Sequence, residues 1–330
     1  MSEADAPPVI LLPSALTAIG PLAVGSWLNW MLMGTLIVQV WYFQNHFSHD
    51  RLSIRLLVYG VMLIDIAQTV ITTHVTWYYS VQNWADPTVF FRDSPWSAAT
   101  IPLFAGLVSG IVQLFYSWRI WVLAPTKVMR GLAILISLIA VSQGATAIVT
   151  SIVIQFDKTQ QRLLELHPAF EYWLAGSFTV DILISAAMLY ILYTAKSRTP
   201  WSRTDNLFNR LIINAIQTGS ITVICAGVDL ALFVAFTSNN YHYVPAYILA
   251  KLYSNSLLAT LNGRKSLNNG STGGSIQTES VGMRLQVSRV TERTTDATIV
   301  RGPWGGDGKV DYSNDIDVES GHRSHKAEAL

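Results

Sequence analysis

Charged residues are scarce in this sequence. Aspartate, glutamate, lysine and arginine make up only 13% of its 330 residues, whereas soluble domains carry roughly 25%. The formal net charge is only +1, so the charge gives no reason to expect a nucleic-acid partner. Cysteine is scarcer still, because Cys225 is the only one and a single cysteine cannot form an internal disulfide. We therefore expect neither a soluble domain nor a fold held by disulfides.

Catalytic and metal-binding motifs are also missing. No phosphate-binding loop, nucleophile triad or redox motif occurs, so we expect neither an enzyme nor a cofactor. His46, His49 and Asp50 lie together in the sequence, and His74, His167 and His242 fall on the opposite side of the expected fold. Neither group has the spacing across facing helices that a built metal site needs, so no metal site is predicted.

Long apolar stretches are abundant instead, since 51% of the residues are hydrophobic. A helix needs about 20 apolar residues to cross the hydrocarbon core of a bilayer. We therefore predict an all-α protein, a bundle of seven transmembrane helices in contact with the lipid bilayer. The predicted helices lie near residues 21–43, 54–79, 97–122, 131–156, 172–193, 211–236 and 243–261.

The composition divides the chain into three parts. Residues 1–19 are expected to form a flexible N-terminus, and residues 20–264 a membrane domain. Residues 265–330 are rich in serine, threonine, glycine, asparagine and charge, so we predict a disordered tail. Within it, 281–290 alternates apolar and other residues. We expect a fluctuating segment there, and the alternative is a strand that pairs with the sheet edge of a protein partner.

Lysine and arginine are distributed unevenly between the two predicted sides of the membrane. Eleven follow the first, third, fifth and last predicted helices, and three lie on the opposite side. Because basic residues accumulate on the cytosolic side, we predict an external N-terminus and a cytosolic tail. Arg119, Arg203 and Arg210 are then candidates for a cytosolic interface. The predicted helices indicate a multi-pass membrane protein, and the sequence leaves open whether it belongs to the plasma membrane or another endomembrane.

Four ionisable residues lie well inside the predicted helices, where each costs about 2.5–3.5 kcal/mol to insert. Counting 1.5 Å per residue from the outer helix ends puts Asp229, Lys251 and Asp181 at depths of about 10, 12 and 14 Å, with Asp65 at about 20 Å. Lys251 is therefore expected to pair with Asp229 first and with Asp181 second. Asn255, also in the last helix, is a further buried polar candidate.

The charged layer admits two interpretations. The first is a structural ion pair that locks helices together, and this is the one we favour. The second is a ligand site, an ion site or a proton relay inside the bundle. A retinal Schiff base on Lys251 is not expected, because the helix at 97–122 has no carboxylate to act as counter-ion. A rhodopsin-like receptor is not expected either, because paired external cysteines are missing and Asn255 is followed by serine, not proline.

Several motifs lie in residues 199–264: Arg203-Thr204-Asp205, Asn209-Arg210-Leu211-Ile212 and the run from Lys251 to Asn262, KLYSNSLLATLN, closed by Arg264. With these motifs the segment resembles the C-terminal half of a large fungal family of multi-pass membrane proteins that is catalogued as a domain of unknown function. The resemblance implies a seven-helix fungal membrane protein and no particular activity. One departure lies in the second helix, where the family often has histidine three residues after the aspartate and this chain has Gln68 after Asp65.

Three function classes follow from these observations. A receptor or sensor is favoured by the serine- and threonine-rich tail and the basic cytosolic loops, with a small ligand outside and a protein partner on the tail. A small-solute transporter or channel is the alternative, favoured by the charged layer and by glutamine and asparagine within the helices. An enzyme is the least supported of the three.

Overall fold

The computed structural model describes residues 15–48, 50–84, 86, 88–89, 92–197, 202–236 and 239–263, with the side chains of 15, 16, 160 and 202–211 left out. Most of the predicted flexible N-terminus, the whole predicted tail, His49 and the side chains of Arg203 and Arg210 lie outside the described residues.

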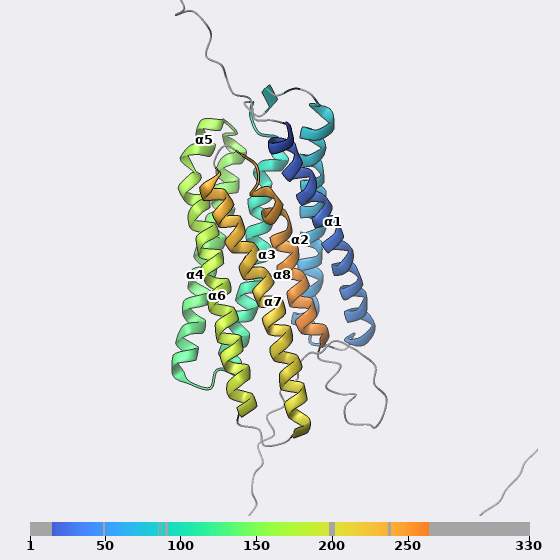
Figure 1. Cartoon of the computed structure of the whole chain (residues 1–330), viewed down its shortest axis with the longest axis vertical. Helices are drawn as coiled ribbons and strands as arrows, with labels where there is room; N and C mark the ends of the chain where they lie inside the picture. Colours follow the sequence, from blue (N-terminus) through green and yellow to red (C-terminus); the bar gives the residue numbers. More distant parts are fainter. Residues whose placement is uncertain are drawn as a thin grey trace, which may run out of the picture. The chain divides into compact units, whose positions relative to one another are not determined.

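The described elements are all helices, as predicted, and the described ranges contain no strand. Each predicted segment falls within one long helix to within a residue, and most of the helices extend beyond the prediction. In chain order (Figure 1) they are α1 (Ala15–His46), α2 (Leu52–Trp77) with a π-helical turn (Tyr78–Gln82), α3 (Trp96–Leu123), α4 (Lys127–Phe156), the short α5 (Gln160–Glu165), α6 (His167–Ser197), α7 (Ser202–Ala235) and α8 (Tyr243–Asn262).

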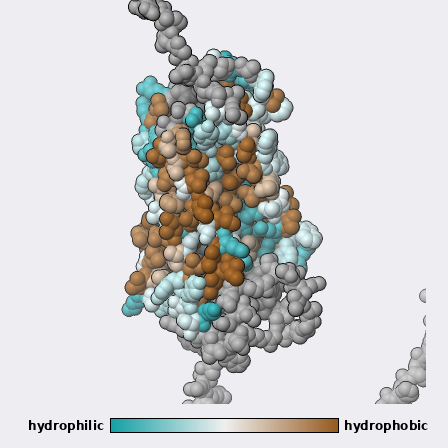
Figure 2. Space-filling view, in the orientation of Figure 1, coloured by the Kyte–Doolittle hydropathy of each residue, from teal (hydrophilic) through white to brown (hydrophobic). Residues whose placement is uncertain are grey.

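Six of these helices, α1, α2, α3, α4, α6 and α7, are long and apolar enough to cross a membrane. Large hydrophobic side chains are exposed along them, among them Val38, Leu63 and Leu138, each with more than 60% of its surface accessible. Figure 2 shows such residues covering much of one face of the helices. Exposed apolar surface on this scale is typical of contact with lipid, so the helices form a membrane-embedded bundle.

The eighth helix, α8, is shorter and less apolar because it lies inside the bundle. It packs against α1, α2, α3 and α7, and eleven of its 20 residues are buried. At Gly25 of α1, a side-chain carbon would lie only 2.9 Å from the backbone oxygen of Tyr243, so glycine is what allows α1 to approach the start of α8. Surrounded by protein, α8 can carry polar side chains that find partners on its neighbours.

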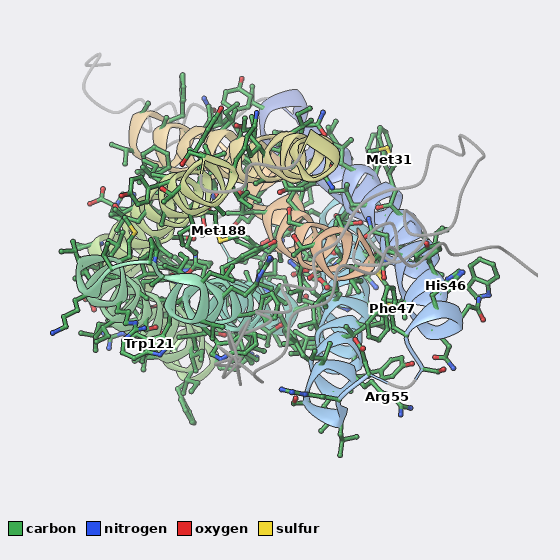
Figure 3. All side chains as sticks on the ribbon, turned by 90° about the horizontal axis from the view of Figure 1, so that it is seen from below. Met31, His46, Phe47, Arg55, Trp121 and Met188 are labelled. Carbon is green, nitrogen blue, oxygen red and sulfur yellow. The ribbon has the colours of Figure 1, made fainter. Side chains whose placement is uncertain are left out.

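The third helix, α3, is the other central element, in contact with α2, α4, α6 and α8. Gly106 touches α4 so closely that a side-chain carbon there would lie 2.7 Å from Cβ of Ala147. Viewed along the bundle, Met188 of α6 points inward among the helices whereas Trp121 of α3 lies on the outside (Figure 3). The centre of the bundle is therefore built from α3, α6 and α8.

Candidate functional site

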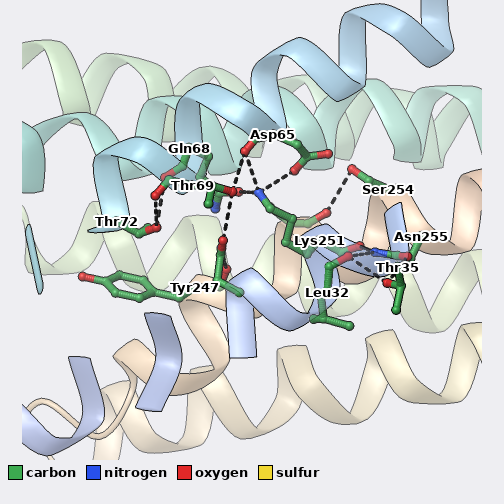
Figure 4. A network of polar contacts seen from close by, with 12 residues as sticks. Leu32, Thr35, Asp65, Gln68, Thr69, Thr72, Tyr247, Lys251, Ser254 and Asn255 are labelled. Atoms are coloured by element: carbon green, nitrogen blue, oxygen red, sulfur yellow. Dashed lines mark hydrogen bonds and ion pairs between the residues drawn. The ribbon is translucent and has the colours of Figure 1, made fainter. Parts of the chain in front are cut away.

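Lys251 of α8 forms an ion pair with Asp65 of α2. Its ammonium Nζ lies 2.8 Å from the carboxylate Oδ1 of Asp65, 2.9 Å from the backbone oxygen of Asp65 and 2.6 Å from Oε1 of Gln68. All three side chains are fully buried (Figure 4). An ammonium has three protons to donate, and here each proton has an acceptor. The lysine is thus held by α2 through a complete set of charge-assisted hydrogen bonds.

The predicted pairing of Lys251 with Asp229 is wrong, and so is the second choice, Asp181. Asp229 of α7 lies beside His242, with 3.9 Å between its Oδ1 and the Nδ1 of the histidine. His242 precedes α8, and Lys251 follows it nine residues later, which is about 13 Å along a helix. Asp229 therefore lies about 13 Å from the lysine along the bundle axis, toward the end at which α8 begins.

Asp65 comes level with the lysine because the helix ends are not level with one another. Thr76 of α2 donates to the backbone oxygen of Leu22, which fixes α2 against α1, while α8 starts beside Gly25, one turn further along α1. Asp65 lies eleven residues from Thr76, and the lysine lies eight residues from Tyr243. Both charges therefore lie about 16 Å from the level of Leu22.

Asn255, the polar candidate one turn after the lysine, fastens α8 to α1. Its Nδ2 donates to the backbone oxygens of Lys251 and Leu32 at 2.7 and 3.2 Å. Its Oδ1 accepts from Thr35 at 2.7 Å and from Gln39 at 3.1 Å. Together with the ion pair, these bonds join α1, α2 and α8 (Figure 4). These contacts fit the interpretation of the buried charges as a structural ion pair that holds helices together.

Asp181 of α6 belongs to a second buried polar network, in the middle of the bundle. Its Oδ2 accepts a hydrogen bond of 2.6 Å from the hydroxyl of Tyr253, and its Oδ1 accepts one of 3.1 Å from Nε2 of Gln113. The Tyr253 hydroxyl also lies 3.0 Å from Oγ of Ser177, and Gln113 accepts from Gln143 at 2.8 Å. We call these five residues the central layer. They come from α3, α4, α6 and α8 and tie those helices together.

Two cavities lie on opposite sides of the central layer. The larger, about 250 Å³, is lined by residues from the end of the bundle that holds α5, among them Leu163, His167 and Asp229. The smaller, about 80 Å³, is lined by residues nearer the opposite end, among them Arg119 and Asn214. Tyr253 lines both. The central layer therefore separates the two cavities.

Asp229 is the charged group of the larger cavity. Its surface is only 1% exposed, and its Oδ1 has no hydrogen-bond partner among the described residues. The neighbouring His242 does not supply one, since 3.9 Å is too long for a hydrogen bond. Burial, followed by the nearby His167, lowers the pKa of His242 to about 4, so this side chain is neutral near pH 7. A buried carboxylate that lines a cavity and has an unpaired oxygen is suited to binding a donor group of a ligand.

The remaining predicted residues fall into two groups. Arg119 lines the smaller cavity and lies 5.9 Å from the ring centres of both Phe115 and Tyr116. Arg203 and Arg210 belong to α7, and their side chains are outside the described residues, so they stay predictions. In the described part of the chain, no three histidine, cysteine, aspartate or glutamate side chains are grouped as metal ligands.

Sequence reasoning missed Tyr253, the residue shared by the two cavities. Tyr253 follows Lys251 by two positions, which in a helix turns it by about 200° to the opposite face. A tyrosine within an apolar helix does not stand out in the sequence, although its hydroxyl needs a hydrogen-bond partner once it is buried. The helical spacing from Lys251 was the signal that could have paired the Tyr253 hydroxyl with Asp181.

Residues 177–266 match the model of a family described as a family of unknown function (DUF6534). The matched part begins at Ser177 and includes Asp181, Asp229, Lys251 and Tyr253, but not Asp65. It includes residues 199–264, over which the resemblance to a domain of unknown function was found; it assigns no activity and says nothing of a fungal origin. No curated protein and no solved structure matches the chain.

Proposed function

We propose that this chain is a seven-helix membrane receptor or sensor that binds a small ligand in the larger cavity. In this proposal α8 is the seventh span, the end with α5 faces outward, and the opposite end faces the cytosol. The observation that carries it is Asp229, which lines the cavity and whose buried Oδ1 has no hydrogen-bond partner among the described side chains. A buried polar group of this kind is expensive unless something pairs with it.

The size and the position of the larger cavity favour a small ligand. Its volume of about 250 Å³ is below the 300–1,000 Å³ of typical pockets for drug-sized molecules, which suits a molecule with a single ring. Leu163 and Leu164 of the short α5 line it, so this cavity lies near the end of the bundle. A ligand could enter there without passing through the lipid-facing surface.

The closed central layer favours sensing over transport. Asp181, Gln113 and Tyr253 hydrogen-bond across the bundle between the two cavities. A receptor needs such a seal, because its ligand must alter the arrangement of the helices without passing through the bundle. Movement of α6 or α8 around these bonds would carry the signal toward Arg119 and the predicted cytosolic tail.

A small-solute transporter is the second candidate, and the smaller cavity favours it. Two cavities that share Tyr253 would become one pathway, open alternately to each side, if the central layer rearranged. The two candidates differ in whether one position of the larger cavity can be reached from both sides of the membrane.

Cysteine labelling separates the two candidates. Cys225→Ala removes the single native thiol, and Ser109→Cys and Ser185→Cys then place one thiol in the larger and one in the smaller cavity. The full chain in vesicles is treated with a membrane-impermeant maleimide on one side at a time. Gln161→Cys and Lys127→Cys, exposed at opposite ends of the bundle, report which side is reached.

A receptor predicts labelling of Ser109→Cys only from the side that labels Gln161→Cys, and of Ser185→Cys only from the side that labels Lys127→Cys. Labelling of Ser109→Cys from both sides would support the transporter and contradict the receptor. Failure of Ser109→Cys to react from either side would contradict both, because no ligand could then reach Asp229.

A further inference from the structure

The described lining of the larger cavity contains an acidic side chain without a matching strong base. Its titratable lining consists of Asp229, His167, His242 and two tyrosines, and none of the described lining residues is lysine or arginine. Arg162, which precedes the lining residue Leu163, forms an ion pair with Glu165 at 2.6 Å. His242 is neutral near pH 7 for the reason given above. His167 contacts a different carboxylate, with 3.3 Å between its Nδ1 and Oε1 of Glu171. No lysine or arginine in the described lining is therefore available to neutralise the Asp229 carboxylate.

A chain of aromatic rings leads from His242, which lies beside this carboxylate, along the wall of the cavity. Phe233 lies at the centre of the chain, with its ring 4.5 Å from that of His167, 5.1 Å from that of His242 and 6.0 Å from that of Phe170. Phe170 continues to Trp173 at 6.4 Å, and all of these rings line the cavity. The faces of aromatic rings attract cations, especially where water is excluded.

A carboxylate without a basic partner, beside a row of aromatic rings, is the arrangement that recognises organic cations. We propose that the larger cavity binds an organic amine or quaternary ammonium compound with one small apolar group. This inference rests on the proposed ligand-binding function and names the class of its ligand. The charged nitrogen pairs with the carboxylate of Asp229, and its substituents contact Phe233 and the rings beside it. A neutral or anionic molecule of the same shape lacks the first interaction.

Three small molecules of similar shape and different charge test the proposal: phenethylamine, phenethyl alcohol and phenylacetate. The thermal unfolding of the purified full chain in detergent is followed as each is added. The proteins compared are the wild type, Asp229→Asn, Ala246→Phe and Asp86→Asn. Ala246 lines the cavity, so a phenylalanine there fills it. Asp86 lies in the α2–α3 connection and bonds to Arg92, so it is the control for removing an aspartate elsewhere.

We expect phenethylamine to raise the Tm of the wild type and of Asp86→Asn with saturation, and the other two compounds to have no effect. Binding should weaken at least tenfold in Asp229→Asn and disappear in Ala246→Phe. Should Asp229→Asn not fold, Phe233→Leu takes its place with phenyltrimethylammonium as the probe, and several-fold weaker binding is expected.

Each contrary outcome has a separate meaning. If phenethyl alcohol or phenylacetate stabilises the wild type as well as the amine does, and Ala246→Phe abolishes this, the ligand site stands and the cation class is wrong. Undiminished amine binding in Asp229→Asn also overturns the cation class. No stabilisation of the wild type by phenethylamine or phenyltrimethylammonium overturns it as well, while the labelling experiment above continues to test the receptor.

Discussion

Two acidic residues of the bundle have opposite surroundings. Asp65 is paired with a lysine at 2.8 Å, and neither residue is among those that line the two cavities. Asp229 is equally buried, lines a cavity and has a carboxylate oxygen with no hydrogen-bond partner in the described structure. Burial alone therefore does not distinguish a structural charge from one that can bind a ligand. The presence of a partner and of space beside the group does.

Breaking the Lys251 ion pair should produce the largest loss of stability. Lys251→Met leaves the Asp65 carboxylate buried without its counter-charge, which typically costs about 3–5 kcal/mol. Replacing both residues, Lys251→Met with Asp65→Leu, should restore most of the loss because neither charge then needs a partner. Unfolding of the four proteins of the double-mutant cycle in detergent measures the coupling.

The matched control for this cycle is Lys251→Met combined with Asp229→Leu. Asp229 lies beside His242, about two and a half turns along α8 from the lysine, so this combination should not restore stability. Equal recovery in both double mutants would show that the Asp65 pair has no special role.

Removing the Tyr253 hydroxyl should have the next largest effect. Tyr253→Phe takes away the 2.6 Å hydrogen bond to Asp181 and leaves a buried acceptor, which costs about 2 kcal/mol. The same change should increase labelling of Ser109→Cys from the far side, because the hydroxyl joins α8 to α6 between the cavities. Unfolding and labelling are both measured, with Tyr172→Phe as the control on the exposed surface of α6. Loss of stability without any change in labelling would mean that the layer does not seal the bundle.

Lowering the pH should destabilise the folded protein through protonation of His242. Its pKa in the folded protein, about 4, lies below the 6.5 of an unperturbed histidine, so the unfolded chain binds more protons between these pH values. Stability should therefore fall as the pH is lowered from 6.5 toward 4. With this pKa difference, the loss at pH 5 should be about 2 kcal/mol. His242→Asn should show a shallower decline than the wild type in melting curves recorded across this range.

Replacing Asp229 should have the smallest effect on stability in the absence of ligand. Asp229→Asn keeps the shape and removes a charge that has no counter-charge, so the free energy of unfolding should stay the same or rise by up to about 1 kcal/mol. Asp65→Asn, the same substitution at the paired site, should instead cost about 3 kcal/mol because it strands Lys251. Similar losses in both variants would remove the contrast between the two carboxylates.

The positions of the helices and of the buried charges could be predicted from the sequence. Long apolar stretches reveal membrane helices because backbone groups in lipid must be satisfied within the helix. Asp65, Asp181, Asp229 and Lys251 were identified correctly as buried, since all four are at most 3% exposed. These results depend on local composition alone.

The pairing of the charges could not be predicted, because it depends on how far each helix slides past its neighbours. The depth of Lys251, counted from the start of α8, came out too small. The reason is that α8 begins beside Gly25, one turn deeper in the bundle than Leu22, where Thr76 meets α1. The close approach at Gly25 sets that offset, and nothing in the local sequence reports it. The cavity beside Asp229 was equally hidden, because its walls come from segments between Ser94 and Tyr253.

The central layer also has an electrical consequence. Water in the two cavities would bring a high dielectric to both sides of Asp181 and Tyr253, since even the smaller cavity, at about 80 Å³, has room for a few molecules. The membrane potential would then fall mainly across this thin layer and not across the full hydrocarbon thickness of about 30 Å. A proton passing between the cavities would cross most of that potential, worth about 2.3 kcal/mol per 100 mV.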